Sequence, residues 1–203
     1  MVKINRIYTR TGDAGETGLG DGARVSKADP RVDAIGEVDT ANAVVGLAVS
    51  VCDDQQPCHT AIRAALLDAQ QDLFDLGADL CVPLTLEEAP GARLRVAPAQ
   101  TKRLENAIDI WNKRLAPLTS FVLPGGCELA ARLHVARTAV RTAERRLRVL
   151  FDTQPDTTNP ETLVYLNRLS DLLFVLARVA NDDGQADRLW TPGVNRDNQT
   201  DSA

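Results

Sequence analysis

The segment from Phe121 to Leu150 constrains the fold of this chain more than any other stretch. It starts with a short apolar run, is interrupted by Pro-Gly-Gly, and continues with apolar residues at alternating spacings of four and three. This spacing places them on one stripe of an α-helix, which must be buried against other helices. The stripe comprises Leu129, Leu133, Ala136, Val140, Ala143, Leu147 and Leu150.

A row of arginines, Arg137, Arg141, Arg145 and Arg148, runs beside this stripe. Like charges at this spacing destabilise an isolated helix by about 0.2–0.5 kcal/mol per pair, so the row needs anionic partners. The partners can be acidic side chains on neighbouring helices, or a polyphosphate whose oxygens the planar guanidinium groups bind bidentately. The helix alone favours the acidic side chains, because ion-pair networks also collect arginines.

The helix that follows the N-terminal segment is predicted from a capping signal. Asp29 followed by Pro30 is typical of a helix start, and the apolar pattern extends to about Cys52. On the polar side of this helix, Asp39 and Asn42 share a narrow strip. The Asp39 carboxylate can therefore face a cation on another helix.

Three more helices are predicted over residues 58–80, 98–116 and 160–181, and the region 81–97 between two of them reads as an exposed loop. The chain has 203 residues and only 4% aromatic residues, which favours one all-α domain, a five-helix bundle with aliphatic seams. Residues 182–203 are rich in Asp, Asn and Gly and are predicted to form a flexible tail.

The first 28 residues are rich in glycine, threonine and charged side chains and show no helical period. Such a backbone can present its N–H groups as an anion-binding nest, and the threonine hydroxyls and two cations would complete a phosphate cradle. A flexible terminal arm explains the composition equally well. The segment matches neither the P-loop nor the dinucleotide-binding pattern. The single domain 1–203 thus divides into this loop (1–28), a helical bundle (29–181) and the tail.

Composition and charge disfavour several other functions. A net charge of −5 argues against nucleic-acid binding, which needs a broad basic surface. No apolar run approaches the roughly 20 residues of a membrane span, and the N-terminus lacks a signal peptide, so a cytoplasmic protein without a membrane partner is expected. Cys52, Cys58, Cys81 and Cys127 are predicted to be buried free thiols, and no metal site is expected.

Four blocks of this sequence, in this order, resemble the PduO-type ATP:cob(I)alamin adenosyltransferases. The blocks are YTRTGDAGETGLGDGARVSK, AIGEVDTANAVVG, FVLPGG followed by LHVARTAVRTAER, and YLNRLSDLLFVLAR. The resemblance implies a homotrimer of five-helix bundles with ATP bound between the N-terminal loop of one subunit and the helices of its neighbour. It implies transfer of the 5′-deoxyadenosyl group of ATP to Co(I) of cobalamin, with Mg²⁺ present and triphosphate released. An adenosylcobalamin-dependent enzyme would receive the product.

The resemblance also implies roles for individual residues. Those expected at the nucleotide are Thr9, Arg10, Thr11, Gly12, Thr17, Gly18, Lys27, Arg141, Glu144, Arg145 and Asn167. Arg137 resembles an arginine that pairs across the subunit interface with an acid, here Asp39. Phe121 resembles the phenylalanine that occupies the lower face of the corrin ring; the residues alone allow it to be either a plug over the bundle end or part of a ligand pocket. The residues expected to carry the reaction are Asp39, Phe121, Arg137 and Arg141.

Two departures from the family pattern affect these expectations. Thr40-Ala41 replaces an acid and a leucine after Asp39, and Thr142 replaces a second arginine after Arg141. The Thr142 change affects either nucleotide affinity or interface pairing. A non-catalytic bundle that binds or senses a nucleotide is the alternative function, and a nucleic-acid-binding helical protein is a third.

Overall fold

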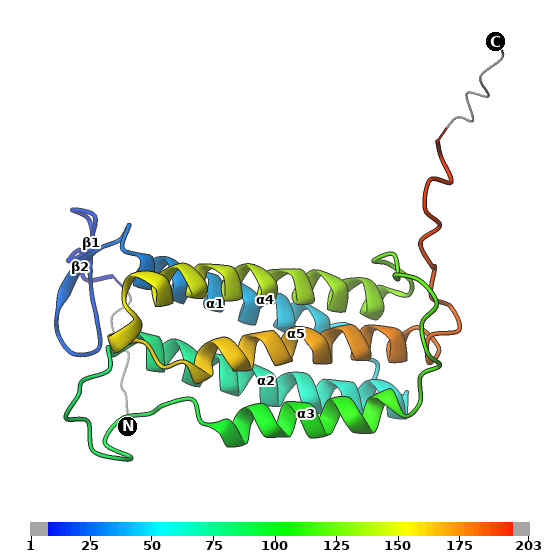
Figure 1. Cartoon of the computed structure of the whole chain (residues 1–203), viewed down its shortest axis with the longest axis horizontal. Coiled ribbons are helices and arrows are strands. Elements are labelled where there is room, and N and C mark those ends of the chain that lie inside the picture. The colour runs from blue at the N-terminus through cyan, green and yellow to red at the C-terminus, as the bar shows by residue number, and fades with distance from the viewer. Residues whose placement is uncertain (1–7, 197–203) are drawn as a thin grey trace, which may run out of the picture.

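The structure, a computed structural model, describes residues 8–196; the predictions for residues 1–7 and 197–203 lie outside it. The described chain forms five α-helices packed side by side along one axis (Figure 1), which confirms the predicted all-α bundle. The helices are α1 (Pro30–Val49), α2 (Pro57–Cys81), α3 (Pro98–Asn112), α4 (Glu128–Thr153) and α5 (Glu161–Ala180). None of these helices is long and apolar enough to cross a membrane.

The predicted start of α1 is confirmed in detail, and its end lies earlier than expected. The Asp29 side chain accepts a hydrogen bond from the backbone N–H of Arg31 at 2.8 Å, and Pro30 occupies the first turn. After Val49 the hydrogen bonding tightens, because the N–H of Cys52 donates to the carbonyl of Val49, only three residues back. Tightened last turns of this kind satisfy carbonyls that a helix end leaves free.

Helix α4 occupies the centre of one side of the bundle, between α1 and α5. The apolar stripe predicted for this helix is confirmed: Leu129 is 2% exposed, and the other six members are fully buried. Tyr165 of α5 is also fully buried, and its hydroxyl donates to Asp72 of α2 at 3.0 Å. The core is therefore made of aliphatic seams, as the composition predicts.

A small hairpin in the N-terminal segment was not predicted. Strand β1 (Glu16–Gly18) pairs antiparallel with β2 (Arg24–Ser26) at the end of the bundle where α1 begins (Figure 1). Between the strands, the N–H of Gly20 donates to the carbonyl of Cys81 at 2.8 Å. A Cβ at this glycine would lie 2.6 Å from a methyl group of Val82, so a larger residue here would force Val82 or the hairpin to shift.

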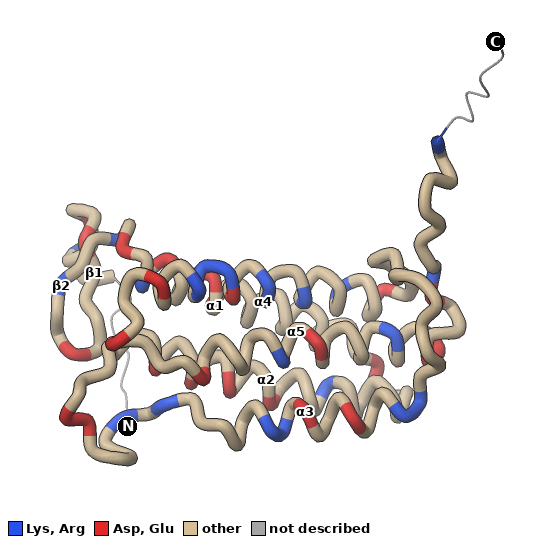
Figure 2. The backbone as a smooth tube through the Cα atoms, viewed as in Figure 1, with Lys and Arg blue, Asp and Glu red and all other residues tan. Residues whose placement is uncertain are grey.

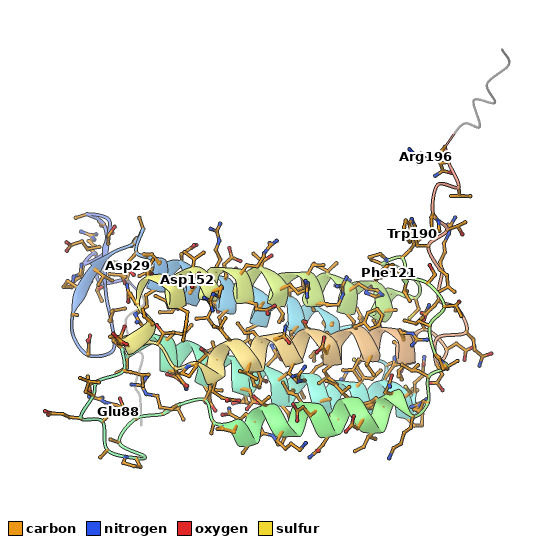
Figure 3. The ribbon with its side chains drawn as sticks, viewed as in Figure 1. Asp29, Glu88, Phe121, Asp152, Trp190 and Arg196 are labelled. Carbon is orange, nitrogen blue, oxygen red and sulfur yellow. The ribbon has the colours of Figure 1, made fainter. Side chains whose placement is uncertain are left out.

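The region around the Pro-Gly-Gly turn lies at the other end of the bundle. Residues 182–190, predicted as the start of a flexible tail, return to this end, where Leu189 forms an isolated antiparallel bridge with Val122. Figure 3 shows Phe121 and Trp190 close together here, far from Asp29 at the start of α1. The hairpin and the bridge thus mark opposite ends of the bundle. The short 3₁₀ helix η1 (Pro155–Thr157) links α4 to α5.

All four cysteines are free, as predicted. Cys52 is buried and Cys58 and Cys81 are half-buried, but the prediction of burial is wrong for Cys127, which is exposed. Cys127 precedes α4, and its sulfur accepts a hydrogen bond from the N–H of Ala130 at 3.4 Å. This residue caps a helix at the surface, whereas the other three lie within or beside packed helices.

Candidate functional site

The arginine row of α4 is only partly neutralised within the protomer. Basic residues follow one another along this helix in Figure 2. Arg148 forms an ion pair with Asp152 on the same helix, and Arg145 donates to the hydroxyl of Thr142 at 3.2 Å. Among residues 8–196, neither Arg137 nor Arg141 has an ion-pair partner. Acidic side chains within residues 8–196 therefore do not explain these two arginines.

Arg137 is the more unusual of the two, because part of its guanidinium group is buried without a partner. Its Nε atom is inaccessible to solvent and makes no hydrogen bond within the described chain. Burial lowers the pKa of Arg137, and the nearby charge of Arg141 lowers it further. Buried polar groups normally have partners, so an orphaned donor beside an open pocket marks a place where a ligand or a second subunit can bind.

Arg137 lines a pocket of about 470 Å³ together with two phenylalanines. The remaining lining residues are Leu118, Ser120 and Val122. Phe121 is 77% exposed and reaches the pocket from the segment before α4, while Phe174 reaches it from α5. The interpretation of Phe121 as a plug over the bundle end is therefore wrong. The pocket offers two aromatic surfaces and one cation, which suits a large, flat ligand with polar edges.

A second group of predicted residues lies on the exposed face formed by α4 and α5. The side-chain amide of Asn167 donates to the Glu144 carboxylate at 2.9 Å, which joins the two helices. Arg141 and Arg145 are exposed and lie within one turn of Glu144 on α4. The structure thus brings together the four residues that the resemblance assigns to the nucleotide on these helices.

The N-terminal loop brings its own predicted residues into one exposed unit. The hydroxyls of Thr9 and Thr11 are 2.9 Å apart, and Arg10 between them has a φ of 62°, a left-handed conformation that is costly for a residue with a side chain. The ammonium group of Lys27 lies so close to Gly12 that a Cβ there would be 3.3 Å from it. Strained backbone and gathered donors are typical of binding loops. The role of the loop in nucleotide binding stays a prediction.

Thr17 and Gly18 belong to β1, so the hairpin continues this unit. The side chain of Arg24 on β2 reaches back to donate to the carbonyl of Thr11 at 2.7 Å. All predicted loop residues therefore lie at the hairpin end of the bundle. The pocket that contains Phe121 lies at the opposite end (Figures 1 and 3).

Asp39 forms no ion pair with Arg137 within the described residues of this protomer. It lines a largely apolar groove of about 500 Å³ between α1 and α2, where Phe74 is 70% exposed. The carboxylate of Asp39 has no ion-pair partner in the described part of the chain, and the buried Oδ1 of neighbouring Asn42 has no hydrogen bond there. The predicted pairing of Asp39 with Arg137 is thus absent within one protomer, as a contact between subunits would require.

His134 is a residue of this region to which sequence analysis gave no role. It is 4% exposed, its ring packs edge-on against Phe174 with centroids 6.2 Å apart, and its Nδ1 lacks a partner in residues 8–196. Burial lowers the pKa of His134 and the charge of Arg137 lowers it further, against a smaller opposing effect of Asp187. Its position one turn before Arg137, next to the apolar stripe, could have indicated that it supports the pocket.

We expect His134 to make stability depend on pH. Its pKa in the folded protein lies below the ordinary value of 6.5, so the unfolded chain binds the proton more readily. The contribution of His134 to the free energy of unfolding is therefore fully present above pH 6.5. It falls as the pH drops from 6.5 towards the folded pKa, by up to about 1.4 kcal/mol per pH unit. Urea unfolding of the wild type and of His134→Leu between about pH 8 and about pH 5 measures this. The difference in the free energy of unfolding between the two proteins should change below pH 6.5. A difference that stays constant over the whole pH range would contradict the prediction.

Comparisons with known proteins agree with this arrangement. A family model described as cobalamin adenosyltransferase matches residues 7–180. A corrinoid adenosyltransferase of Mycobacterium tuberculosis is 49% identical over 195 residues, 96% of this chain and 97% of that protein. A cobalamin adenosyltransferase of Cupriavidus metallidurans is 46% identical over 190 residues, 93% of this chain and 95% of that protein.

A solved structure gives the same result for the fold. It is a variant PduO-type ATP:corrinoid adenosyltransferase from Lactobacillus reuteri complexed with cobalamin and ATP. It aligns with a TM-score of 0.83 at 37% identity, over 92% of this chain and 97% of the other. The chain belongs to the cobalamin adenosyltransferase family.

Proposed function

We propose that this protein transfers the 5′-deoxyadenosyl group of ATP to the cobalt of a reduced corrinoid. Co(I) donates an electron pair to C5′ of the ribose, the bond from C5′ to the phosphate oxygen breaks, and triphosphate leaves with that bonding pair. The observation that carries the proposal is the pocket in which Phe121 and Phe174 accompany Arg137, whose Nε lacks a partner within the described residues. Such a pocket fits a macrocycle with a broad apolar face.

Phe121 has a specific role in this proposal. Its exposed ring would contact the lower face of the corrin and exclude the lower axial ligand of the cobalt. Four-coordinate Co(II) is easier to reduce to Co(I) than cobalt with an axial ligand. The protein thus supplies position and exclusion, while the corrinoid supplies the nucleophile.

The exposed arginines of α4 would stabilise the leaving group. Negative charge builds up on the triphosphate as its bond to C5′ breaks, so preorganised cations lower the barrier. Arg141 and Arg145 supply such cations on one face of α4, and Glu144 is held beside them by Asn167. Lys27 and the threonine hydroxyls of the N-terminal loop would bind the phosphate oxygens, and a Mg²⁺ ion bound to the triphosphate would supply further positive charge.

The distance along the bundle supports a site shared between two subunits, which the proposed homotrimer would supply. Helix α4 has 26 residues and is therefore about 39 Å long, and the loop and the pocket lie near its two ends. One ATP molecule cannot contact both in the same protomer while its ribose reaches the pocket. A site that uses both segments needs the loop of one subunit and the pocket of another. The cytoplasmic location and the recipient enzyme remain predictions.

The pairing of Asp39 with Arg137 across subunits can be tested by exchanging the charges. We expect Arg137→Asp or Asp39→Arg alone to weaken assembly and lower activity, because each leaves two like charges facing one another. The double variant should recover both properties in part. Sedimentation analysis and initial rates measure the outcome, and single variants with normal assembly and rates would contradict the contact.

Turnover is the direct test of the proposed function. Purified protein given ATP, Mg²⁺ and chemically reduced cobalamin should form adenosylcobalamin, identified by a light-sensitive change in the visible spectrum. Absence of product at every protein concentration would reject the proposal. Calorimetry that shows ATP binding without cobalamin binding would then select the non-catalytic nucleotide-binding alternative.

A further inference from the structure

A short C-terminal segment lies alongside the segment that carries Phe121. We refer to residues 187–190 as the C-terminal strap. The N–H of Trp190 donates to the carbonyl of Phe121 at 2.7 Å, and the N–H of Leu123 donates to the carbonyl of Arg188 at 2.8 Å. The backbone of Phe121 is therefore paired with the strap, although the segment belongs to no helix.

The side chain of Trp190 adds a second contact to the same residue. The rings of Phe121 and Trp190 are 6.1 Å apart between centroids and tilted by 56°, a favourable geometry for an aromatic pair. Trp190 does not line the pocket that contains Phe121 and Arg137; it lines a separate groove with Leu123 and Arg188. The indole thus packs against the phenylalanine without itself bordering the pocket.

The root of the strap is fixed by a buried ion pair. The Asp187 carboxylate pairs with Arg178 of α5 at 2.8 Å, and these side chains are only 4% and 7% exposed. Asp187 also accepts a hydrogen bond from the Asn181 side chain at 3.0 Å. Asn181 in turn accepts from the N–H of Cys127 at 3.3 Å, just after the Pro-Gly-Gly turn. The strap and the turn are therefore anchored to the same end of α5.

We propose that Trp190 is a positioning residue that holds the Phe121 ring in place before the corrinoid binds. Phe121 is 77% exposed, and outside the strap its ring has no aromatic contact in residues 8–196. A ring ordered in advance loses less conformational entropy when it must press against the lower face of a corrin. The inference rests on the proposed function and concerns only the step that starts from Co(II).

The test compares two routes to the same product in the full-length protein. One assay starts from cob(II)alamin with a reductant, and the other starts from cobalamin already reduced to Co(I). Trp190→Ala should slow the first route by about tenfold and the second by less than about twofold. Trp190→Phe should recover most of the loss, because it keeps an aromatic ring beside Phe121. Phe121→Ala gives the limiting effect of losing the ring itself.

Two further readouts separate positioning from general damage. The fraction of bound cob(II)alamin that is four-coordinate, measured by electron paramagnetic resonance, should fall in Trp190→Ala and return in Trp190→Phe. Hydrogen exchange at the Leu123 amide should become faster in Trp190→Ala, without any substrate present. Leu86→Ala, which changes a fully exposed side chain in the loop after α2, is the control and should alter neither.

Equal losses on both routes, or no loss on either, would overturn the inference and leave Trp190 as a cover over the bundle end. A wild-type protein that makes no adenosylcobalamin would instead reject the proposed function. An unchanged exchange rate at the Leu123 amide in Trp190→Ala would also contradict the positioning role of Trp190, whatever the activity.

Discussion

Replacing Arg141 with alanine is expected to lower turnover by about 10²–10³-fold, the usual effect of removing one preorganised group that stabilises charge in a transition state. Arg141 is exposed and has no ion-pair partner within residues 8–196, so its charge is available to a ligand. The same features predict an almost unchanged free energy of unfolding. Steady-state kinetics together with urea unfolding would separate the two effects.

The same helix supplies a matched control for this variant. Arg148 is also exposed, but it already pairs with Asp152 one turn later. We expect Arg148→Ala to leave turnover close to the wild-type value. Arg141→Lys should recover only part of the activity, because an ammonium group lacks the planar fork that binds two phosphate oxygens. Similar losses in the Arg141 and Arg148 variants would show that general positive charge on α4, rather than Arg141 itself, is what matters.

Replacing Asp79 with alanine is expected to destabilise the protein by about 3–5 kcal/mol, the typical cost of removing one partner from a buried, charged network. The Asp79 side chain is only 1% exposed and pairs with Arg95 at 2.7 Å. It also accepts hydrogen bonds from the N–H of Val96 at 2.8 Å and from the Asn159 side chain at 2.7 Å. Its loss would release the loop before α3 and the start of α5 together.

This effect should appear as a fall of roughly 10 °C in the melting temperature, given the usual relation for a domain of this size. Glu128→Ala is the control, because Glu128 forms an exposed pair with Arg132 within α4 and should change stability by less than about 0.5 kcal/mol. Asp79→Asn keeps the shape of the side chain and one oxygen that can accept hydrogen bonds, so we expect a smaller loss of stability. A melting temperature within 2–3 °C of the wild type in Asp79→Ala would contradict the prediction.

The helices could be predicted because each has a long apolar period and a local start signal. The stripe that includes Leu133 and Leu147 is buried as expected, since burial of a stripe depends mainly on spacing within one helix. The hairpin of residues 16–26 could not be predicted in the same way. Its strands have three residues each, which is too short for an alternating pattern, and its position depends on contacts with the end of α2.

The site could be predicted only in parts. The resemblance named Phe121 and Arg137, but the pocket that they share also needs Phe174 of α5, which follows Phe121 by 53 positions and Arg137 by 37. The arginine row was expected to pair with acids on neighbouring helices, but the partner of Arg148 is Asp152 on the same helix, and Arg141 has none among residues 8–196. Local spacing shows which residues share a helix face, whereas a pocket arises from the packing of separate elements.

The separation of the hairpin from the Phe121 pocket has a consequence for the proposed assembly. Each subunit would give its loop to one neighbour and receive a loop from the other, so the contacts run head to tail around a closed ring. A substitution in the loop of one subunit would then inactivate the site on the neighbouring subunit. The site on its own α4, which receives the loop of the other neighbour, would stay active. In a ring that mixes altered and unaltered subunits, activity would be lost in the subunit that receives the altered loop, not in the subunit that carries the substitution.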